Sequence, residues 1–245
     1  MVEPLIQIRE VTKKYGTKMV HDGINMPIYK GEILTLMGGS GSGKSVLLRS
    51  LIGLEKPDSG SIMFHGQDIT KLSEDKLTGI RKRIAYVFQY GALFDSLTIR
   101  ENLAYPLVEH TKLTEAEINE KVRVTLKKVG LEGTEEQLPA DLSGGMQRRV
   151  GVARSIIMDP EVILYDEPTT GLDPYNTKQI LKIILQLKEQ GATSVLVTHD
   201  MSSIFAVTDR VAFLRNGKIE ALGTAEEIKH TPDPIVRGFI YGETM

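Results

Sequence analysis

Eight residues near the start of the chain have the pattern of a phosphate-binding loop. The pattern GxxxxGK[ST] is matched at every fixed position by Gly38, Gly39, Ser40, Gly41, Ser42, Gly43, Lys44 and Ser45. Glycines let such a loop curl until successive N–H groups point inward at an anion. We expect Lys44 to reach the β- and γ-phosphates of a nucleotide and the Ser45 hydroxyl to ligate Mg²⁺.

Two adjacent acids follow a strongly apolar stretch further along the chain. A strand over residues 161–166 is expected to end at Asp166, and Glu167 follows it directly. Ligands of open α/β sheets lie beyond the carboxyl ends of the strands, so both acids are expected at the phosphate site. Asp166 can hold Mg²⁺ through water, and Glu167 can orient and polarise an attacking water. The alternative is a solvated turn, since Pro168 comes next.

Strand and helix patterns alternate at both ends of the chain. An apolar strand over 33–37 precedes the phosphate loop, and a helix is expected over 46–53. The last third repeats the alternation, with a helix ended by Gly191, a strand over 194–198 and a hairpin about Asn216-Gly217. This order predicts an α/β fold with a mostly parallel sheet. Short strands and turns over 5–37 predict a small antiparallel sheet, and Thr224 is expected to open the final helix.

The middle of the chain is helical. Thr98 with Glu101, and Thr114 with Glu117, have the spacing of a capping box, in which the two ends satisfy each other's free backbone N–H groups. We therefore predict one domain over residues 1–245, with a helical subdomain at about 90–160 inserted in the phosphate-binding core.

Composition excludes several function classes. The chain has no cysteine, which rules out disulfides, thiolate zinc sites and a cysteine nucleophile. A net charge of -2 gives no reason to expect a nucleic acid as partner. The basic clusters at 81–83 and at Arg148-Arg149 are interpreted as solvated faces or helix ends. No apolar stretch approaches the ~18 residues needed to cross a bilayer, so any work on a membrane is expected to pass through a partner.

A further motif, Leu142-Ser-Gly-Gly-Met146-Gln147, resembles the signature motif of ABC transporter ATPases. Its order relative to the phosphate loop and to Asp166-Glu167 is also similar to theirs, and the resemblance extends over about residues 5–230. It implies an ATPase that uses ATP and Mg²⁺. It also implies the fold of the family, a P-loop NTPase core with an N-terminal antiparallel β-subdomain and an inserted α-helical lobe.

The resemblance assigns roles to four single residues. Gln89 matches the glutamine that senses Mg²⁺ and the attacking water, and His199 matches the switch histidine that holds the γ-phosphate. Tyr15 matches the aromatic residue that stacks on adenine, and Asp173 matches the D-loop aspartate. Structural alternatives stay open, because His199 or Tyr15 could simply pack and Asp173 could simply cap the helix that begins near Pro174.

The signature motif implies a dimer. Ser143, Gly144 and Gly145 are expected to begin a helix whose amides face the γ-phosphate of a second subunit's ATP. Two copies of the chain would then meet head-to-tail and form two composite sites. Met146 and Gly39 depart from the residues most frequent in the family, Gln and Pro, which points to a subfamily.

Three segments together resemble the Mla-type ATPases, namely 89–107, 142–149 and 232–239. This resemblance implies bacterial phospholipid transport from the cytoplasmic face of the inner membrane. The implied partners are a multi-span permease, an MCE-domain protein and a small STAS-domain protein. The segment after Gln89 is where such ATPases meet the permease; the alternative is that Phe94 and Leu97 belong to the core of the helical lobe.

Three other functions are weighed against this one. The chain could energise an ABC transporter for another substrate, such as a polar amino acid. It could be an ABC-type ATPase that acts on DNA or the ribosome, although its short insertion and single cassette count against both. It could also bind nucleotide without hydrolysis, but Lys44, Asp166, Glu167 and His199 are all intact.

Overall fold

In the computed structural model, residues 3–242 are described, apart from the side chain of Ser202. The main sheet has six strands in the order β10-β9-β3-β8-β7-β6. These are β3 (Ile33–Met37), β6 (Ile84–Val87), β7 (Val162–Asp166), β8 (Thr193–Val197), β9 (Arg210–Arg215) and β10 (Lys218–Thr224). All neighbours are parallel except β9 and β10, which form the hairpin expected at Asn216-Gly217. The predicted α/β fold is confirmed.

A second, antiparallel sheet has the order β2-β1-β4-β5. Its strands are β1 (Ile6–Tyr15), β2 (Lys18–Ile28), β4 (Ser59–Phe64) and β5 (Gln67–Asp68). The expected short strands at the N-terminus are instead two long ones. The reason is an irregularity in register between Ile8 and Val11, where Glu10 has a φ of 46°. Such a bulge breaks the alternation of apolar and polar residues by which a continuous strand is recognised.

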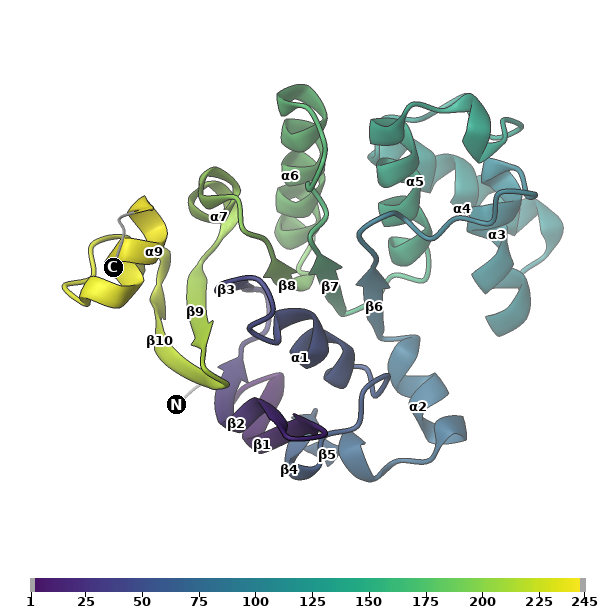
Figure 1. Cartoon of the computed structure of the whole chain (residues 1–245). Helices are drawn as coiled ribbons and strands as arrows, with labels where there is room; N and C mark the ends of the chain where they lie inside the picture. Colours follow the sequence, from purple (N-terminus) through teal and green to yellow (C-terminus); the bar gives the residue numbers. More distant parts are fainter. Residues whose placement is uncertain (1–2, 243–245) are drawn as a thin grey trace.

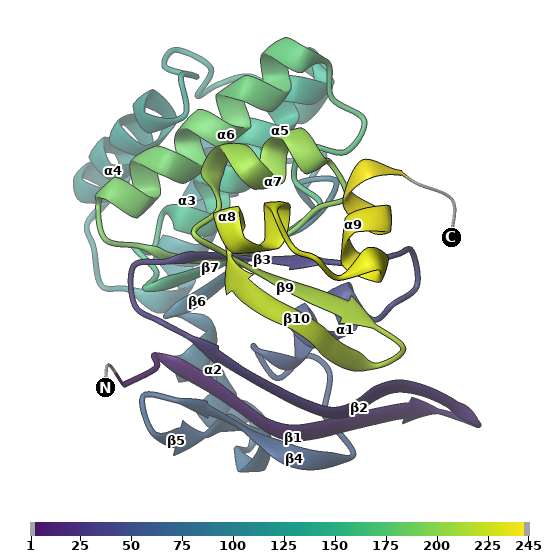
Figure 2. The ribbon, with the colours of Figure 1, turned by 90° about the vertical axis from the view of Figure 1, so that its left-hand side faces the viewer.

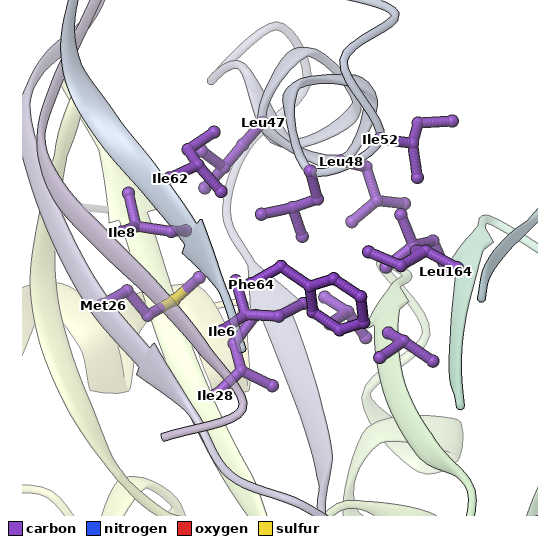
Figure 3. Close-up of a cluster of buried hydrophobic side chains, with 14 of the residues drawn as sticks. Ile6, Ile8, Met26, Ile28, Leu47, Leu48, Ile52, Ile62, Phe64 and Leu164 are labelled. Atoms are coloured by element: carbon purple, nitrogen blue, oxygen red, sulfur yellow. The ribbon is translucent and has the colours of Figure 1, made fainter. Parts of the chain in front are cut away.

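Helix α1 (Lys44–Ser50) lies between the two sheets and anchors the loop before it. Figure 3 shows Leu47 and Leu48 of α1 among the apolar side chains of both sheets, and Phe64 is one of them. The helix begins two residues earlier than expected, immediately after Gly43, and it ends at Ser50, because the chain turns before Gly53. Burial of both leucines, worth roughly 1.5–3 kcal/mol each, fixes the loop relative to the sheet.

Three helices gather beside β6, as Figure 1 shows: α3 (Ile99–His110), α4 (Glu115–Lys128) and α5 (Gly144–Ile156). The capping boxes of Thr98 and Thr114 begin α3 and α4, as predicted. A second apolar cluster joins these helices to the main sheet through residues such as Leu103, Val150 and Tyr165. The domain limits, 1–245 for the whole and about 90–160 for the helical subdomain, stay predictions.

The other helices are α2 (Glu74–Arg81), α6 (Pro174–Glu189), α7 (Met201–Val207), α8 (Ala225–Lys229) and α9 (Pro234–Tyr241). In Figure 2, α6, α7, α8 and α9 lie on one side of the main sheet, and the antiparallel sheet lies on the other. Thr224 does open a helix, α8, but a further one, α9, follows it. Within residues 3–242, no helix is long and apolar enough to cross a membrane.

Candidate nucleotide-binding site

Close packing explains two glycines of the phosphate loop between β3 and α1. At Gly38, with φ 155°, a Cβ atom would lie 2.3 Å from the carbonyl oxygen of Leu214. At Gly43, with φ 100°, it would lie 2.8 Å from Nε2 of His21. A larger residue at either position would displace the backbone or a buried ring, so the loop requires glycine there for reasons of packing as well as phosphate approach.

Lys44 is held inside the loop. Its side chain is almost buried, and Nζ donates to the carbonyl oxygens of Gly38 and Gly39, each at 2.8 Å. Burial lowers the pKa of the Lys44 ammonium, and the carboxylates of Glu167 and Asp166 oppose that shift. The ammonium is therefore poised to exchange carbonyl oxygens for the oxygens of an anion.

Asp166 connects the loop with the neighbouring strand. The Ser45 hydroxyl donates to its Oδ1 at 2.7 Å, and the Tyr86 hydroxyl donates to its Oδ2 at 2.7 Å. Burial, together with that hydrogen bond, raises the pKa of the Tyr86 phenol, which keeps it protonated as a donor. Ser45 and Asp166 place two hard oxygen ligands side by side, and such ligands fit Mg²⁺.

Glu167 is turned away from its strand by an unusual backbone. Its φ is 50°, and its N–H donates to the carbonyl of Val197 at 2.9 Å. Oε2 accepts from the Thr170 hydroxyl at 2.8 Å and lies 3.2 Å from Nδ1 of His199. The His199 side chain is 61% exposed, so it is no buried core histidine. A non-glycine residue with positive φ is uncommon, and here it aims the carboxylate at a fixed point.

A pocket of about 780 Å³ brings most of the predicted residues together. The phosphate loop except Ser42 lines it, together with Glu167, His199 and Tyr15, which is 47% exposed. Asp166 joins the group through Ser45. The pocket also includes Phe239 of α9, which sequence reasoning missed along with Tyr86 and Thr170. The Thr170 hydroxyl could have been suspected from its position three residues after Glu167.

Other predicted residues lie outside this pocket. Gln89 is partly exposed after β6 and is not among the residues that line it. Ser143 caps α5 and accepts from the Met146 N–H at 3.3 Å; like Gly144, it is exposed. Gly145 packs on Asn176, where a Cβ atom would lie 2.2 Å from the side chain. Asp173 caps α6, as expected, through the Asn176 N–H at 3.0 Å.

Of the interpretations as a solvated face or a helix end, the solvated face is wrong for Arg148, and Arg149 is only partly exposed. Arg148 is 7% exposed, and Nη1 of the partly buried Arg149 donates to the carbonyl oxygens of Val129 at 3.1 Å and Gly130 at 3.2 Å. Both side chains bond to neighbouring segments of the chain, which a charge count along the sequence does not reveal.

Comparison with known proteins agrees with the geometry. The ABC transporter family model matches residues 21–170. The intermembrane phospholipid transport system ATP-binding protein MlaF of Haemophilus influenzae is 40% identical over 245 residues, covering 100% of this chain and 93% of that protein. The probable ribonucleotide transport ATP-binding protein mkl of Mycobacterium leprae is 40% identical over 241 residues, covering 98% and 70%. The dimeric ATP-binding cassette MJ0796, in a post-hydrolysis state bound to ADP and Pi, superposes with a TM-score of 0.82 at 33% identity, covering 89% and 98%.

The fold and the phosphate-loop pocket define a nucleotide-binding ATPase. The chain belongs to the ABC transporter family and is an ATP-binding subunit of that family. The predicted family and the predicted ATPase activity are confirmed.

Proposed function

We propose that the chain hydrolyses ATP to drive phospholipid transport at the cytoplasmic face of a bacterial inner membrane. One observation carries the ATPase chemistry: Lys44, the Ser45–Asp166 pair and the Glu167–His199 pair converge on one pocket. The choice of phospholipid is supported by 40% identity over the full length of this chain to a relative named for that transport.

Each residue has a physical part in the proposed reaction. Lys44 compensates charge on the phosphates in the ground and transition states. Ser45 and Asp166 would hold Mg²⁺, which supplies further charge neutralisation. Glu167, oriented by the Thr170 hydroxyl, polarises the attacking water. His199 holds the γ-phosphate, and the Tyr15 ring packs on adenine.

The signature residues favour a dimer with two composite sites. Ser143 and Gly144 are exposed and Gly145 lies against Asn176, yet none of the three lines the pocket of their own chain. An isologous dimer would bring this end of α5 to the γ-phosphate of the partner's ATP. Asp173, bonded to Asn176, would stabilise the same surface. The dimeric MJ0796 cassette with bound ADP and Pi supports this arrangement.

A second pocket, of about 520 Å³, suits a membrane permease. Its lining includes Tyr105 and Arg154, together with Phe88, which directly precedes Gln89 in the sequence. Phe94 is 41% exposed, and its ring centroid lies 5.3 Å from that of Tyr105, so it belongs to the surface rather than to the core of the helical group. We propose that a short permease helix binds here and that Gln89 relays its state. An MCE-domain protein and a small STAS-domain protein complete the proposed assembly.

Reconstitution with the permease in liposomes tests the substrate. We expect ATP-dependent movement of a fluorescent phospholipid, and none with Glu167→Gln. ATP-dependent uptake of a ribonucleotide, with no lipid movement, would favour the activity named for the mycobacterial relative. ATP hydrolysis that moves neither substrate would contradict the lipid assignment.

A further inference from the structure

Arg148 of α5 is a buried cation with few partners. It is 7% exposed, and its Nη2 donates to the carbonyl oxygen of Thr170 at 3.2 Å. Among residues 3–242, its Nη1 has no hydrogen-bond partner. Burial lowers the pKa of this guanidinium, although arginine stays charged in proteins. A charged donor that is buried and unpaired is costly, so this position needs an explanation beyond packing.

The guanidinium lies between two functional segments. On one side, its central carbon is 5.4 Å from the centroid of the Tyr90 ring, within the range of a cation–π contact. Tyr90 directly follows Gln89 in the segment assigned to the permease. On the other side, Thr170 accepts from Arg148 through its carbonyl and donates through its hydroxyl to Oε2 of Glu167 at 2.8 Å.

The contact between α5 and the segment after β6 is tight. A Cβ atom on Gly151, in the turn of α5 after Arg148, would lie 2.5 Å from Cα of Gly91. The two backbones thus touch with no side chain between them. A displacement of this segment toward α5 therefore cannot be absorbed by side-chain rearrangement, and it would shift α5 or the contacts of Arg148.

We propose that Arg148 is a positioning residue that holds Thr170, and through it the Glu167 carboxylate, in register with the segment after β6. It is not among the residues that line the nucleotide pocket. It makes the orientation of Glu167 depend on whether the permease-facing segment is in place. This inference rests on the proposed function, because it needs Glu167 to polarise the attacking water.

The kinetics of ATP hydrolysis by the complex with its permease test the inference. Arg148→Met keeps the length of the side chain and removes the charge and the donors. We expect kcat to fall about tenfold, the effect of one lost hydrogen bond to a charged group, with KM for ATP within about twofold. Arg148→Lys should recover part of kcat. The control is Arg149→Met on the same helix, which should lower Tm and leave kcat unchanged.

A double-variant comparison separates positioning from general damage. If Arg148 acts through Glu167, adding Arg148→Met to Glu167→Gln should cost nothing further in single-turnover hydrolysis. The inference would be overturned if the two substitutions lowered the rate additively. It would also be overturned if Arg148→Met raised KM with unchanged kcat, or hydrolysed ATP at the wild-type rate. If Arg148→Met does not fold, Arg148→Gln and Arg148→Lys are compared instead. If the wild-type complex had no ATPase activity, the proposed function itself would be refuted. If Lys44→Ala abolished ATP hydrolysis but the Arg148 variants hydrolysed ATP at the wild-type rate, only this inference would be refuted.

Discussion

The substitution Phe94→Asp separates the permease surface from the core of the helical group. The Phe94 ring contacts Tyr105 at a centroid distance of 5.3 Å and lies 4.5 Å from the guanidinium carbon of Arg154. An aromatic pair is worth about 0.5–1.5 kcal/mol and an exposed cation–π contact about 0.5–1 kcal/mol. Removing both contacts lowers the free energy of unfolding by about 1–2.5 kcal/mol. Attraction of the new carboxylate to Arg154 offsets part of this loss. At about 2–4 °C per kcal/mol for a chain of this length, we expect Tm to fall by at most about 10 °C.

Binding to the permease should suffer far more than stability. A carboxylate placed in the interface loses hydration, the apolar ring that would contact the permease is removed, and Arg154 compensates only part of the cost, so we expect permease affinity to fall at least about tenfold. ATP affinity should be unchanged. The measurements are a thermal melt, nucleotide titration and quantitative co-purification. Val124→Asp is the control, because Val124 is similarly exposed, at 38%, but lies on α4 rather than in the segment after β6. A fall in Tm beyond about 15 °C would mean that Phe94 is core; normal permease binding would refute the surface assignment.

Three further predictions concern the nucleotide site and its support. Lys44→Ala should weaken ATP binding and abolish turnover in the complex; near-normal hydrolysis would end its assignment. Ser143→Arg should block turnover in the complex while the isolated chain still binds ATP. Mixing Ser143→Arg chains with Lys44→Ala chains should restore at most one composite site. Full activity of the Ser143→Arg complex would exclude the composite-site model. Burial lowers the pKa of His21 in the folded chain below its ordinary value of 6.5. As pH falls through 6.5, the unfolded chain therefore binds the proton more readily than the folded chain, and the free energy of unfolding decreases. In urea unfolding between about pH 7.5 and 5, the free energy of unfolding should fall less steeply with falling pH in His21→Gln than in the wild type. The same pH dependence in both proteins would contradict this prediction.

Local signals in the sequence predicted much of the fold. Capping boxes at Thr98 and Thr114 depend on residues three positions apart, and both are present. Asn216 and Gly217 have the positive φ angles that a tight hairpin requires, 50° and 77°. Thr224 also begins a helix as expected. In each case neighbouring residues determine the conformation, so distant parts of the chain need not be known.

Features that depend on distant segments could not be predicted. Tyr86 and Asp166 are 80 residues apart, and only the parallel pairing of β6 with β7 brings them together. The burial of Arg148 depends on the contact of α5 with the segment after β6. Phe239 reaches the nucleotide pocket because α9 folds back past β9, where its ring lies 5.2 Å from that of Phe213.

The most direct test of the ATPase account is the behaviour of Glu167→Gln with ATP and Mg²⁺. The substitution keeps the shape of the side chain and removes the charge that polarises water. We predict that hydrolysis slows at least about a hundredfold while ATP stays bound and the chain elutes as a dimer in size-exclusion chromatography. Hydrolysis at the wild-type rate, or a variant that no longer retains ATP, would contradict the role of Glu167 as the group that activates water.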